Sequence, residues 1–202
     1  MPVKKQLKTK KNLSIPTGIK QIETCHLGVP EKSFEIDSRD ESSYIHEHLS
    51  TLNFIVSEFN IQNILEIGTG PGESLVAMIE GTKAHVTTID IENCWLAKHR
   101  VLNGSFSGQV TFVKGESDKL GLTGMWDLIL IDGGHNEIQV RTDIDQFALQ
   151  VKPGGFLIFH DTTNPAWEGV GTAERDFSNR NKETWRRYQW FNCNGLVILR
   201  RK

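Results

Sequence analysis

Two aspartates in this sequence, Asp132 in the stretch IDGGH and Asp161 in the stretch FHDTT, each follow directly on an apolar run. If the two runs are neighbouring strands of one parallel sheet, both carboxylates lie side by side at the same edge. Two anions that close repel each other strongly unless a cation lies between them. Magnesium prefers one or two carboxylates and fills its remaining positions with water and substrate oxygens. The pair therefore predicts a Mg²⁺ site, with capping of the following helices as the alternative role for both residues.

A second candidate site is the stretch NILEIGTGPGESLV, in which an apolar run leads into Gly68, Gly70 and Gly72. Glycines spaced this tightly occur where the backbone approaches a ligand or turns sharply. Glu73 stands where a dinucleotide fingerprint has its third glycine, and no Gly-Lys-Ser/Thr follows, which argues against a pyrophosphate or Walker-type site. Asp90 ends the next apolar run, where a carboxylate accepts the hydroxyls of a ribose. The pattern favours a cofactor that contains a ribose, with a structural turn as the alternative.

The hydrophobic pattern predicts the elements that must position these residues. Helix-length stretches separate five apolar runs, and this alternation is typical of a doubly wound α/β domain whose parallel sheet is buried on both faces. The predicted strands are NILEIG (63–68), HVTTID (85–90), QVTFVKG (109–115), WDLILID (126–132) and GFLIFHD (155–161). Segments 184–191 and 194–201 are joined by a turn too short for a helix, so we expect an antiparallel hairpin. Apolar residues at three- and four-residue spacing predict a helix over 41–59.

The length of 202 residues and the net charge of −2 bound the possible functions. The length fits one domain, which we expect over 41–202, after a lysine-rich tail and irregular lead-in over 1–40. The charge gives no general attraction for nucleic acid, and the lack of a long apolar window argues against a membrane span. Cys25, Cys94 and Cys193 are far apart in the sequence, which argues against disulfides and against a thiolate zinc site. A cytoplasmic location is the simplest expectation.

The E-I-G-x-G-x-G stretch, the acid at Asp90 and the terminal hairpin together resemble the class I S-adenosylmethionine-dependent methyltransferases. This resemblance implies a Rossmann-like, seven-stranded sheet, mostly parallel with a C-terminal antiparallel strand, and S-adenosylmethionine as the cofactor. The residues expected to bind the cofactor are Glu66, Gly68, Gly70, Gly72, Asp90, Ser117 and Asp132. For Ser117, a helix N-cap is an equally good role.

Within that class, the chain resembles the metal-dependent small-molecule O-methyltransferases, of the catechol type and of the macrocin O-methyltransferase and cephalosporin-hydroxylase-like group. The resemblance covers about residues 60 to 202. The matching elements are I-D-G-x-H at 131–135, P-G-G at 153–155 and H-D at 160–161.

This closer resemblance implies roles for four residues. Mg²⁺ is expected on Asp132 and Asp161, and Thr162 stands where relatives often have a further acid or amide, so the hydroxyl is a weaker third ligand or that ligand comes from elsewhere. His135 is the base that takes the proton from the substrate hydroxyl, since a neutral imidazole is available at pH 7. The alternative for His135 is a structural role at a helix start. The expected reaction is methyl transfer to a hydroxyl of a small molecule.

Several alternatives remain open from the sequence. His160 is expected to be structural, because on an extended strand it faces away from Asp161. Trp167 either lines the acceptor pocket or packs in the core, and the stretch Asn164–Trp167 only partly resembles the motif of amino-methyltransferases. The lysine-rich start and the arginines near the end favour an RNA ribose methyltransferase, against which the overall acidity argues. A catalytically inactive binding protein of the same fold is a further alternative, and a homodimer through the N-terminal helix is possible.

Overall fold

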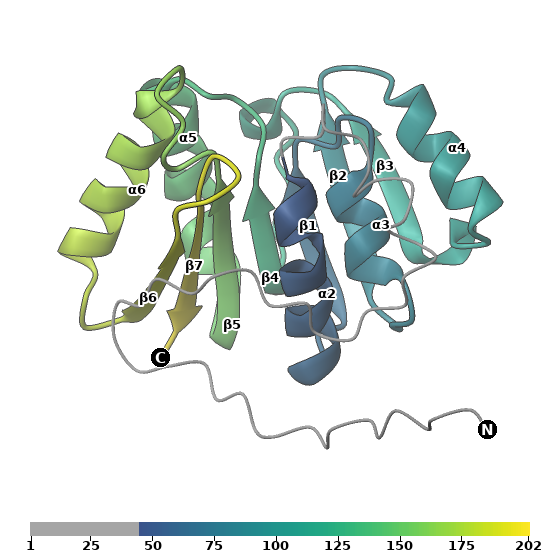
Figure 1. Cartoon of the computed structure of the whole chain (residues 1–202), viewed down its shortest axis with the longest axis horizontal. Coiled ribbons are helices and arrows are strands. Elements are labelled where there is room, and N and C mark those ends of the chain that lie inside the picture. The colour runs from purple at the N-terminus through teal and green to yellow at the C-terminus, as the bar shows by residue number, and fades with distance from the viewer. Residues whose placement is uncertain (1–44) are drawn as a thin grey trace, which may run out of the picture.

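The computed structural model describes residues 45–202. The tail and lead-in predicted over 1–40, and the first residues of the helix predicted over 41–59, lie outside the described residues. One sheet of seven strands runs in the order β3-β2-β1-β4-β5-β7-β6 (Figure 1). The strands are β1 (Asn63–Ile67), β2 (His85–Asp90), β3 (Val110–Lys114), β4 (Trp126–Ile131), β5 (Val151–His160), β6 (Trp185–Trp190) and β7 (Leu196–Arg201).

The strand directions confirm the predicted mixed sheet. The strands β1 to β5 pair with one another in parallel, and β7 runs antiparallel to both β5 and β6. The predicted hairpin is therefore present and closes one side of the sheet. Because β1, β2, β4 and β5 are parallel, their carboxyl ends meet along one edge, the upper edge in Figure 1. The candidate site residues follow these strand ends.

The fifth strand is longer than the sequence pattern predicts. The apolar run indicated a start at residue 155, whereas β5 begins at Val151 and runs for 10 residues. The register between β4 and β5 shifts between Trp126 and Leu128, and Gly154 has a φ of +80°. This irregularity lets the hydrogen-bonded ladder continue past Gly154 and Gly155. Because glycines interrupt the apolar run, the hydrophobic pattern does not indicate this part of the strand.

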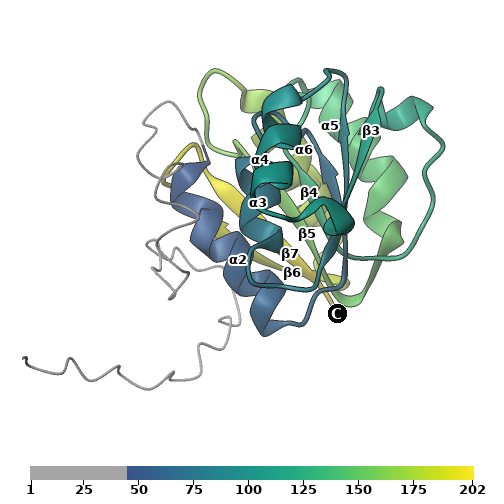
Figure 2. The same cartoon turned by 90° about the vertical axis from the view of Figure 1, so that its right-hand side faces the viewer.

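Helices cover both faces of the sheet. The helices α2 (Leu49–Glu58), α3 (Glu73–Ile79) and α4 (Trp95–Asn103) lie on one face, and α5 (Glu137–Phe147) and α6 (Glu168–Arg180) lie on the other. Figure 2 shows α3 and α4 on one side of the sheet and α5 on the other. Alternating strand residues divide the core, because Ile64 packs beneath the first group of helices and Leu65 beneath the second. No helix within residues 45–202 combines the length and the apolar composition that a membrane crossing requires.

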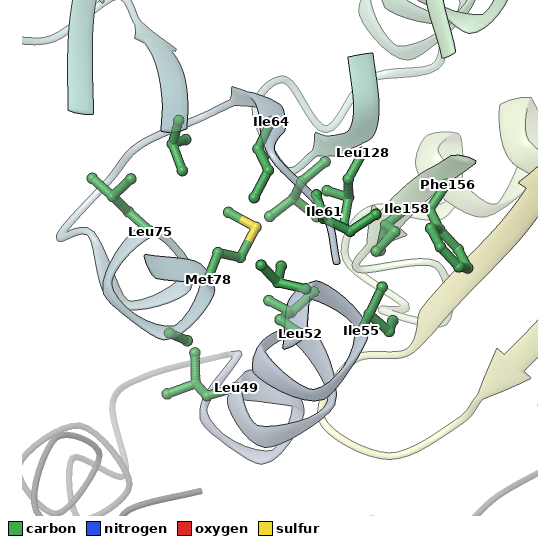
Figure 3. Packing of buried hydrophobic residues seen from close by; sticks show 14 of the residues in the cluster. Leu49, Leu52, Ile55, Ile61, Ile64, Leu75, Met78, Leu128, Phe156 and Ile158 are labelled. Carbon is green, nitrogen blue, oxygen red and sulfur yellow. The ribbon is translucent and has the colours of Figure 1, made fainter. Parts of the chain in front are cut away.

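The helix predicted over 41–59 is present in its second half. Residues His46–His48 form a short 3₁₀ turn, η1, and α2 begins at Leu49. Figure 3 shows Leu52 of α2 and Met78 of α3 among the buried side chains of one cluster. This packing fixes α2 beside α3, and Ile45, just before η1, lines the smaller cavity of the candidate site.

Candidate active site

The glycine loop follows β1 and contains three glycines with different surroundings. Gly68 has a φ of +94°, and a side-chain Cβ there would lie 2.1 Å from the backbone oxygen of Asp132. Gly72 has a φ of +86°, and its Cβ would lie 2.6 Å from Cβ of Ala97. By contrast, a Cβ on Gly70 would meet nothing within 4 Å. Gly68 and Gly72 are thus required by close packing of the protein against itself, and Gly70 faces open space.

Asp90, at the end of β2, holds the glycine loop in place. Its Oδ2 accepts hydrogen bonds from the backbone N–H groups of Thr69 and Gly70, each at 3.0 Å. Its Oδ1 accepts the N–H of Glu92 at 2.8 Å. Partial burial by itself raises the pKa of Asp90, but these backbone donors outweigh it and the pKa lies below the usual value. The carboxylate is therefore ionised at pH 7 and ties the loop to the second strand.

Glu66, on β1, lies beneath the same loop and is fully buried. Ser74 donates a hydrogen bond to one carboxyl oxygen and Thr88 donates one to the other, both at 2.6 Å. Burial raises the pKa of Glu66 to about 8, despite these two donors. The side chain does not line either of the two cavities described below. Glu66 thus joins β1 to Ser74 of α3 and Thr88 of β2, whereas the family resemblance implied a contact with the cofactor.

The larger cavity runs along the carboxyl ends of the strands and has a volume of about 660 Å³. Its lining includes five of the residues predicted to bind the cofactor, namely Gly68, Gly70, Asp90, Ser117 and Asp132. The hydroxyl of Ser117 donates a hydrogen bond of 2.5 Å to Asp143 on α5, and burial raises the pKa of Asp143 to about 6. Ser117 is the first residue of the short 3₁₀ turn η3 (Ser117–Lys119), and the N-cap position is occupied by Glu116. The cavity has the position expected for a nucleoside cofactor in an open α/β sheet.

Two aspartates and two histidines converge at the ends of β4 and β5. His160 Nδ1 lies 3.2 Å from Oδ1 of Asp132 and 3.3 Å from Oδ2 of Asp161. His135 Nε2 lies 3.2 Å from that same oxygen of Asp161. The predicted pairing of the two carboxylates at one edge of the sheet is thus present. The imidazole of His160 lies between the two carboxylates, although strand alternation predicted that it would face the opposite side of the sheet.

The backbone at Asp161 explains why His160 lies in the site. Asp161 has a φ of +60°, so the strand alternation that would send the two side chains to opposite faces is broken at this point. Both side chains are almost fully buried. The expectation that His160 is purely structural on the far side of the sheet was therefore wrong in its geometry. A left-handed conformation at a non-glycine residue leaves no signal in the hydrophobic pattern.

The charges in this cluster support one another. Burial alone would raise the pKa of Asp161, but hydrogen bonds from His135 and His160 hold it well below its usual range. Burial alone would lower the pKa of His160, but the carboxylate of Asp132, aided by Asp161, raises it well above its usual value. A protonated His160 between two carboxylates is the arrangement that electrostatics favours in the absence of another cation.

A smaller cavity of about 230 Å³ lies beside the larger one. The two cavities share four lining residues, which are Gly68, Gly70, Asp132 and His135. Trp167, in the loop between β5 and α6, lines the smaller cavity and stacks on the ring of His135. The ring centroids are 3.8 Å apart and the planes are inclined by 6°. Of the two roles open for Trp167, the structure supports a place in the pocket wall.

Asp132, His135 and Asp161 form a donor set that fits a divalent cation. One ligand atom from each lies within 4.8 Å of the others. Two carboxylates and one imidazole suit the hard or borderline divalent metals. Thr162 does not line either cavity, and its buried hydroxyl has no hydrogen-bond partner among the described residues. The structure therefore brings His135 to the two aspartates and leaves Thr162 beside them, outside the cavity wall.

The sequence of the domain matches a known family. Residues 65–162 match the family described as a methyltransferase domain. The match begins within β1 and ends just after Asp161, so it includes the glycine loop, Asp90 and the cluster at the ends of β4 and β5. No curated protein matches the chain at a significant level.

Solved structures share the fold over most of the chain. The O-methyltransferase from Bacillus cereus in complex with SAH has a TM-score of 0.66 at 15% identity, covering 88% of this chain and 94% of that chain. The O-methyltransferase TomG from Streptomyces achromogenes, involved in tomaymycin synthesis and in complex with SAM, has a TM-score of 0.65 at 14% identity, with 85% and 86% covered. The N-methyltransferase NodS from Bradyrhizobium japonicum in complex with SAH has a TM-score of 0.60 at 20% identity, with 84% and 97% covered.

The family match and the fold lead to one conclusion. Identities this low establish a shared fold, and both oxygen and nitrogen methyltransferases occur among these structures, so the fold leaves the acceptor atom undetermined. The family match supplies the activity, because its description is that of a methyltransferase domain. Residues 65–162 therefore match a methyltransferase domain, and the chain has the fold of methyltransferases whose structures contain SAM or SAH.

Proposed function

We propose that this methyltransferase transfers the methyl group to a hydroxyl oxygen of a small molecule, with assistance from Mg²⁺. The observation that carries the proposal is the position of Asp132 and His135 at the junction of the two cavities. A cofactor in the larger cavity and an acceptor in the smaller one would meet at these two side chains. Bringing two reactants together in this way contributes roughly 7–11 kcal/mol to lowering the barrier.

Asp132 and Asp161 are the proposed magnesium ligands. They contribute carboxylate oxygens that lie within 4.8 Å of each other and of a nitrogen of His135. When bound, such a cation supplies Lewis-acid polarisation of a hydroxyl oxygen. Thr162 was a further candidate ligand, and it is the weakest of the set because it lines neither cavity. Water or the acceptor fills the remaining positions in this proposal.

His135 is the proposed general base. Its Nε2–H donates to Asp161 at 3.2 Å, which leaves Nδ1 as the nitrogen that accepts a proton. When the acceptor hydroxyl gives its proton to Nδ1, Asp161 stabilises the resulting imidazolium. Bound S-adenosylmethionine would supply the methyl group to this oxygen and would leave as S-adenosylhomocysteine. Asp161 thus orients the base and offsets its charge.

The acceptor is proposed to be small and polar. The smaller cavity has a volume of about 230 Å³, and its wall carries Asp132, His135 and Trp167 beside the glycine loop. This volume suits one ring or a sugar-sized group. An RNA acceptor would need a basic groove on the protein to hold its phosphate backbone. The net charge of −2 argues against this acceptor class.

The first test is calorimetric titration with S-adenosylhomocysteine, with and without Mg²⁺. We expect wild type to bind the cofactor product and to show a separate heat of Mg²⁺ binding. Asp132→Asn should lose the Mg²⁺ signal, and Asp145→Asn, an exposed aspartate on α5, should retain it. Cofactor binding without any Mg²⁺ signal in wild type would keep the methyltransferase and remove the metal from the proposal.

The second test addresses the acceptor and the base. Transfer of a labelled methyl group to a panel of phenols, sugars and polyols identifies an acceptor, and His135→Asn should then lower the turnover by about 10²–10⁴-fold. His99→Asn, at an exposed position on α4, is the matched control and should leave turnover unchanged. Transfer to amines but to no hydroxyl compound would contradict the proposed acceptor class.

A further inference from the structure

Three potential metal ligands lie together behind the candidate active site. They are His48 in η1, His160 at the end of β5 and Cys193 in the turn between β6 and β7. One ring nitrogen of each histidine and the sulfur of Cys193 lie within 4.8 Å of one another. The residues are far apart in the sequence, so only the tertiary fold brings them together.

Both histidines are buried, and His48 is oriented by a hydrogen bond at only one of its ring nitrogens. His48 is fully buried, its Nε2 lies 3.1 Å from the carbonyl oxygen of Asn192, and its Nδ1 has no hydrogen-bond partner among the described residues. A buried imidazole nitrogen without a partner costs free energy that a bound ligand would recover. This unsatisfied atom is an observation independent of the three-residue cluster.

His160 has the surroundings typical of a metal-binding histidine. Its Nδ1 faces Asp132 at 3.2 Å, and its Nε2 points toward the Cys193 segment, where it lies 3.1 Å from the backbone oxygen. Metal-binding histidines usually donate the second ring N–H to a carboxylate, which fixes the tautomer and the ring orientation. A cation on Nε2 would replace one proton, and the two carboxylates that face Nδ1 would stabilise its charge.

A fourth donor lies at the rim of the cluster. His46 Nδ1 lies 3.9 Å from the sulfur of Cys193. Zinc is bound by cysteine and histidine at about 2.0–2.3 Å in tetrahedral geometry, so neighbouring ligand atoms lie about 3.5 Å apart. The ligand atoms of His48, His160 and Cys193 lie within 4.8 Å of one another, so a bound ion would draw them closer together. Imidazole and thiolate ligands favour zinc over the hard cation proposed for Asp132 and Asp161.

We propose that His48, His160 and Cys193, with His46 as the fourth ligand, bind a zinc ion. The ion would connect the start of α2 to the β6–β7 turn and would hold His160 with its Nδ1–H directed at Asp132. The site would thus position the carboxylate of Asp132 through His160, which also lines the smaller cavity. The proposal does not depend on the methyl acceptor or on Mg²⁺.

Cobalt substitution in the full chain tests this site without an activity assay. The protein is stripped of metal with a chelator and titrated with Co²⁺, whose bond to a thiolate gives an intense near-ultraviolet absorption. We expect this band in wild type and in Cys94→Ser, the matched control at the partly buried cysteine before α4. Cys193→Ser should lose the band, and His48→Gln should abolish or strongly weaken it. Asp132→Asn should keep it, which separates this site from the proposed Mg²⁺ site.

The outcomes that would overturn the site are equally definite. Absence of the band in wild type would mean that the cluster is only a hydrogen-bonded contact. A band that survives Cys193→Ser or His48→Gln would place the metal elsewhere. Circular dichroism of each variant establishes that a lost band reflects a lost ligand in a folded protein. Loss of the Co²⁺ band on addition of Zn²⁺ establishes that zinc binds at the same site.

Discussion

The imidazole of His135 lies flat against the indole of Trp167, with ring centroids 3.8 Å apart and planes inclined by only 6°. The same imidazole contacts Asp161 through Nε2 at 3.2 Å. Both partners follow β5, so the segment after this strand fixes the ring from its face and from its edge. The proposed base is thereby oriented before any acceptor arrives.

Replacing Trp167 should therefore impair turnover more than cofactor binding. Stacked aromatic pairs contribute about 0.5–1.5 kcal/mol, so we expect Trp167→Leu to lower the turnover by up to about tenfold and Trp167→Phe to retain most of it. Affinity for S-adenosylhomocysteine should stay within about twofold, since Trp167 lines only the smaller of the two cavities. Trp95→Leu, at a largely exposed tryptophan on α4, is the control. Unchanged turnover in Trp167→Leu would show that the stacking does not position the base.

Asp90 is predicted to serve both the loop and the cofactor. Its carboxylate accepts backbone N–H groups of Thr69 and Gly70, so Asp90→Asn should destabilise the fold by about 1–3 kcal/mol. It should also abolish measurable binding of S-adenosylhomocysteine. Calorimetry and denaturant unfolding of the same variant give both quantities.

Asp127 provides a matched control for that prediction. Its carboxylate likewise accepts two backbone N–H groups, those of Gln62 and Asn63, but it lies at the opposite end of the sheet. Asp127→Asn should cost similar stability and leave cofactor binding intact. If both variants lose binding equally, the effect of Asp90→Asn comes from general destabilisation.

Much of the fold was predictable because buried parallel strands read as continuous apolar runs. All five runs became strands, with ends that differ from the prediction by one residue at most except at β5. There, Gly154 and the register shift on β4 conceal four further residues of strand. The fold depends on patterns that extend over many residues, so one local irregularity moves a boundary without changing the topology.

The positions of site residues that follow directly on predicted strands could be predicted from the sequence. Positions that depend on a single backbone angle could not. Asp132 and Asp161 followed from their places after two adjacent strands. His160 did not, because its entry into the site depends on a φ of +60° at Asp161. The cluster of His48 with Cys193 was also hidden, since spacing along the sequence argued against a thiolate zinc site and only tertiary contacts unite these residues.

Gly68 should be the least replaceable glycine of the loop for stability. A Cβ there would lie 2.1 Å from the backbone oxygen of Asp132, in addition to the strain of a φ of +94°. We expect Gly68→Ala to cost about 3 kcal/mol or more in the free energy of unfolding. Gly81→Ala is the control, because Gly81 has a φ of +68° and a Cβ there would meet nothing within 4 Å. It should cost only about 1–2 kcal/mol. Equal losses in denaturant unfolding would mean that the contact with Asp132 relaxes without cost.

The raised pKa of Glu66 should make the folded protein less stable as the pH rises. Burial raises the pKa of Glu66 from 4.5 to about 8, so in that interval the folded state keeps a proton that the unfolded state has lost. The contribution of Glu66 to stability is therefore full below about pH 4.5 and falls by up to about 1.4 kcal/mol per pH unit up to about pH 8. Glu66→Gln cannot ionise and still offers Ser74 or Thr88 a hydrogen-bonding partner. The difference in unfolding free energy, variant minus wild type, should thus rise steadily between pH 5 and pH 8. A difference that stays flat across this range would mean that Glu66 is already ionised in the folded protein at pH 5, with its two hydroxyl donors sufficient to hold the charge.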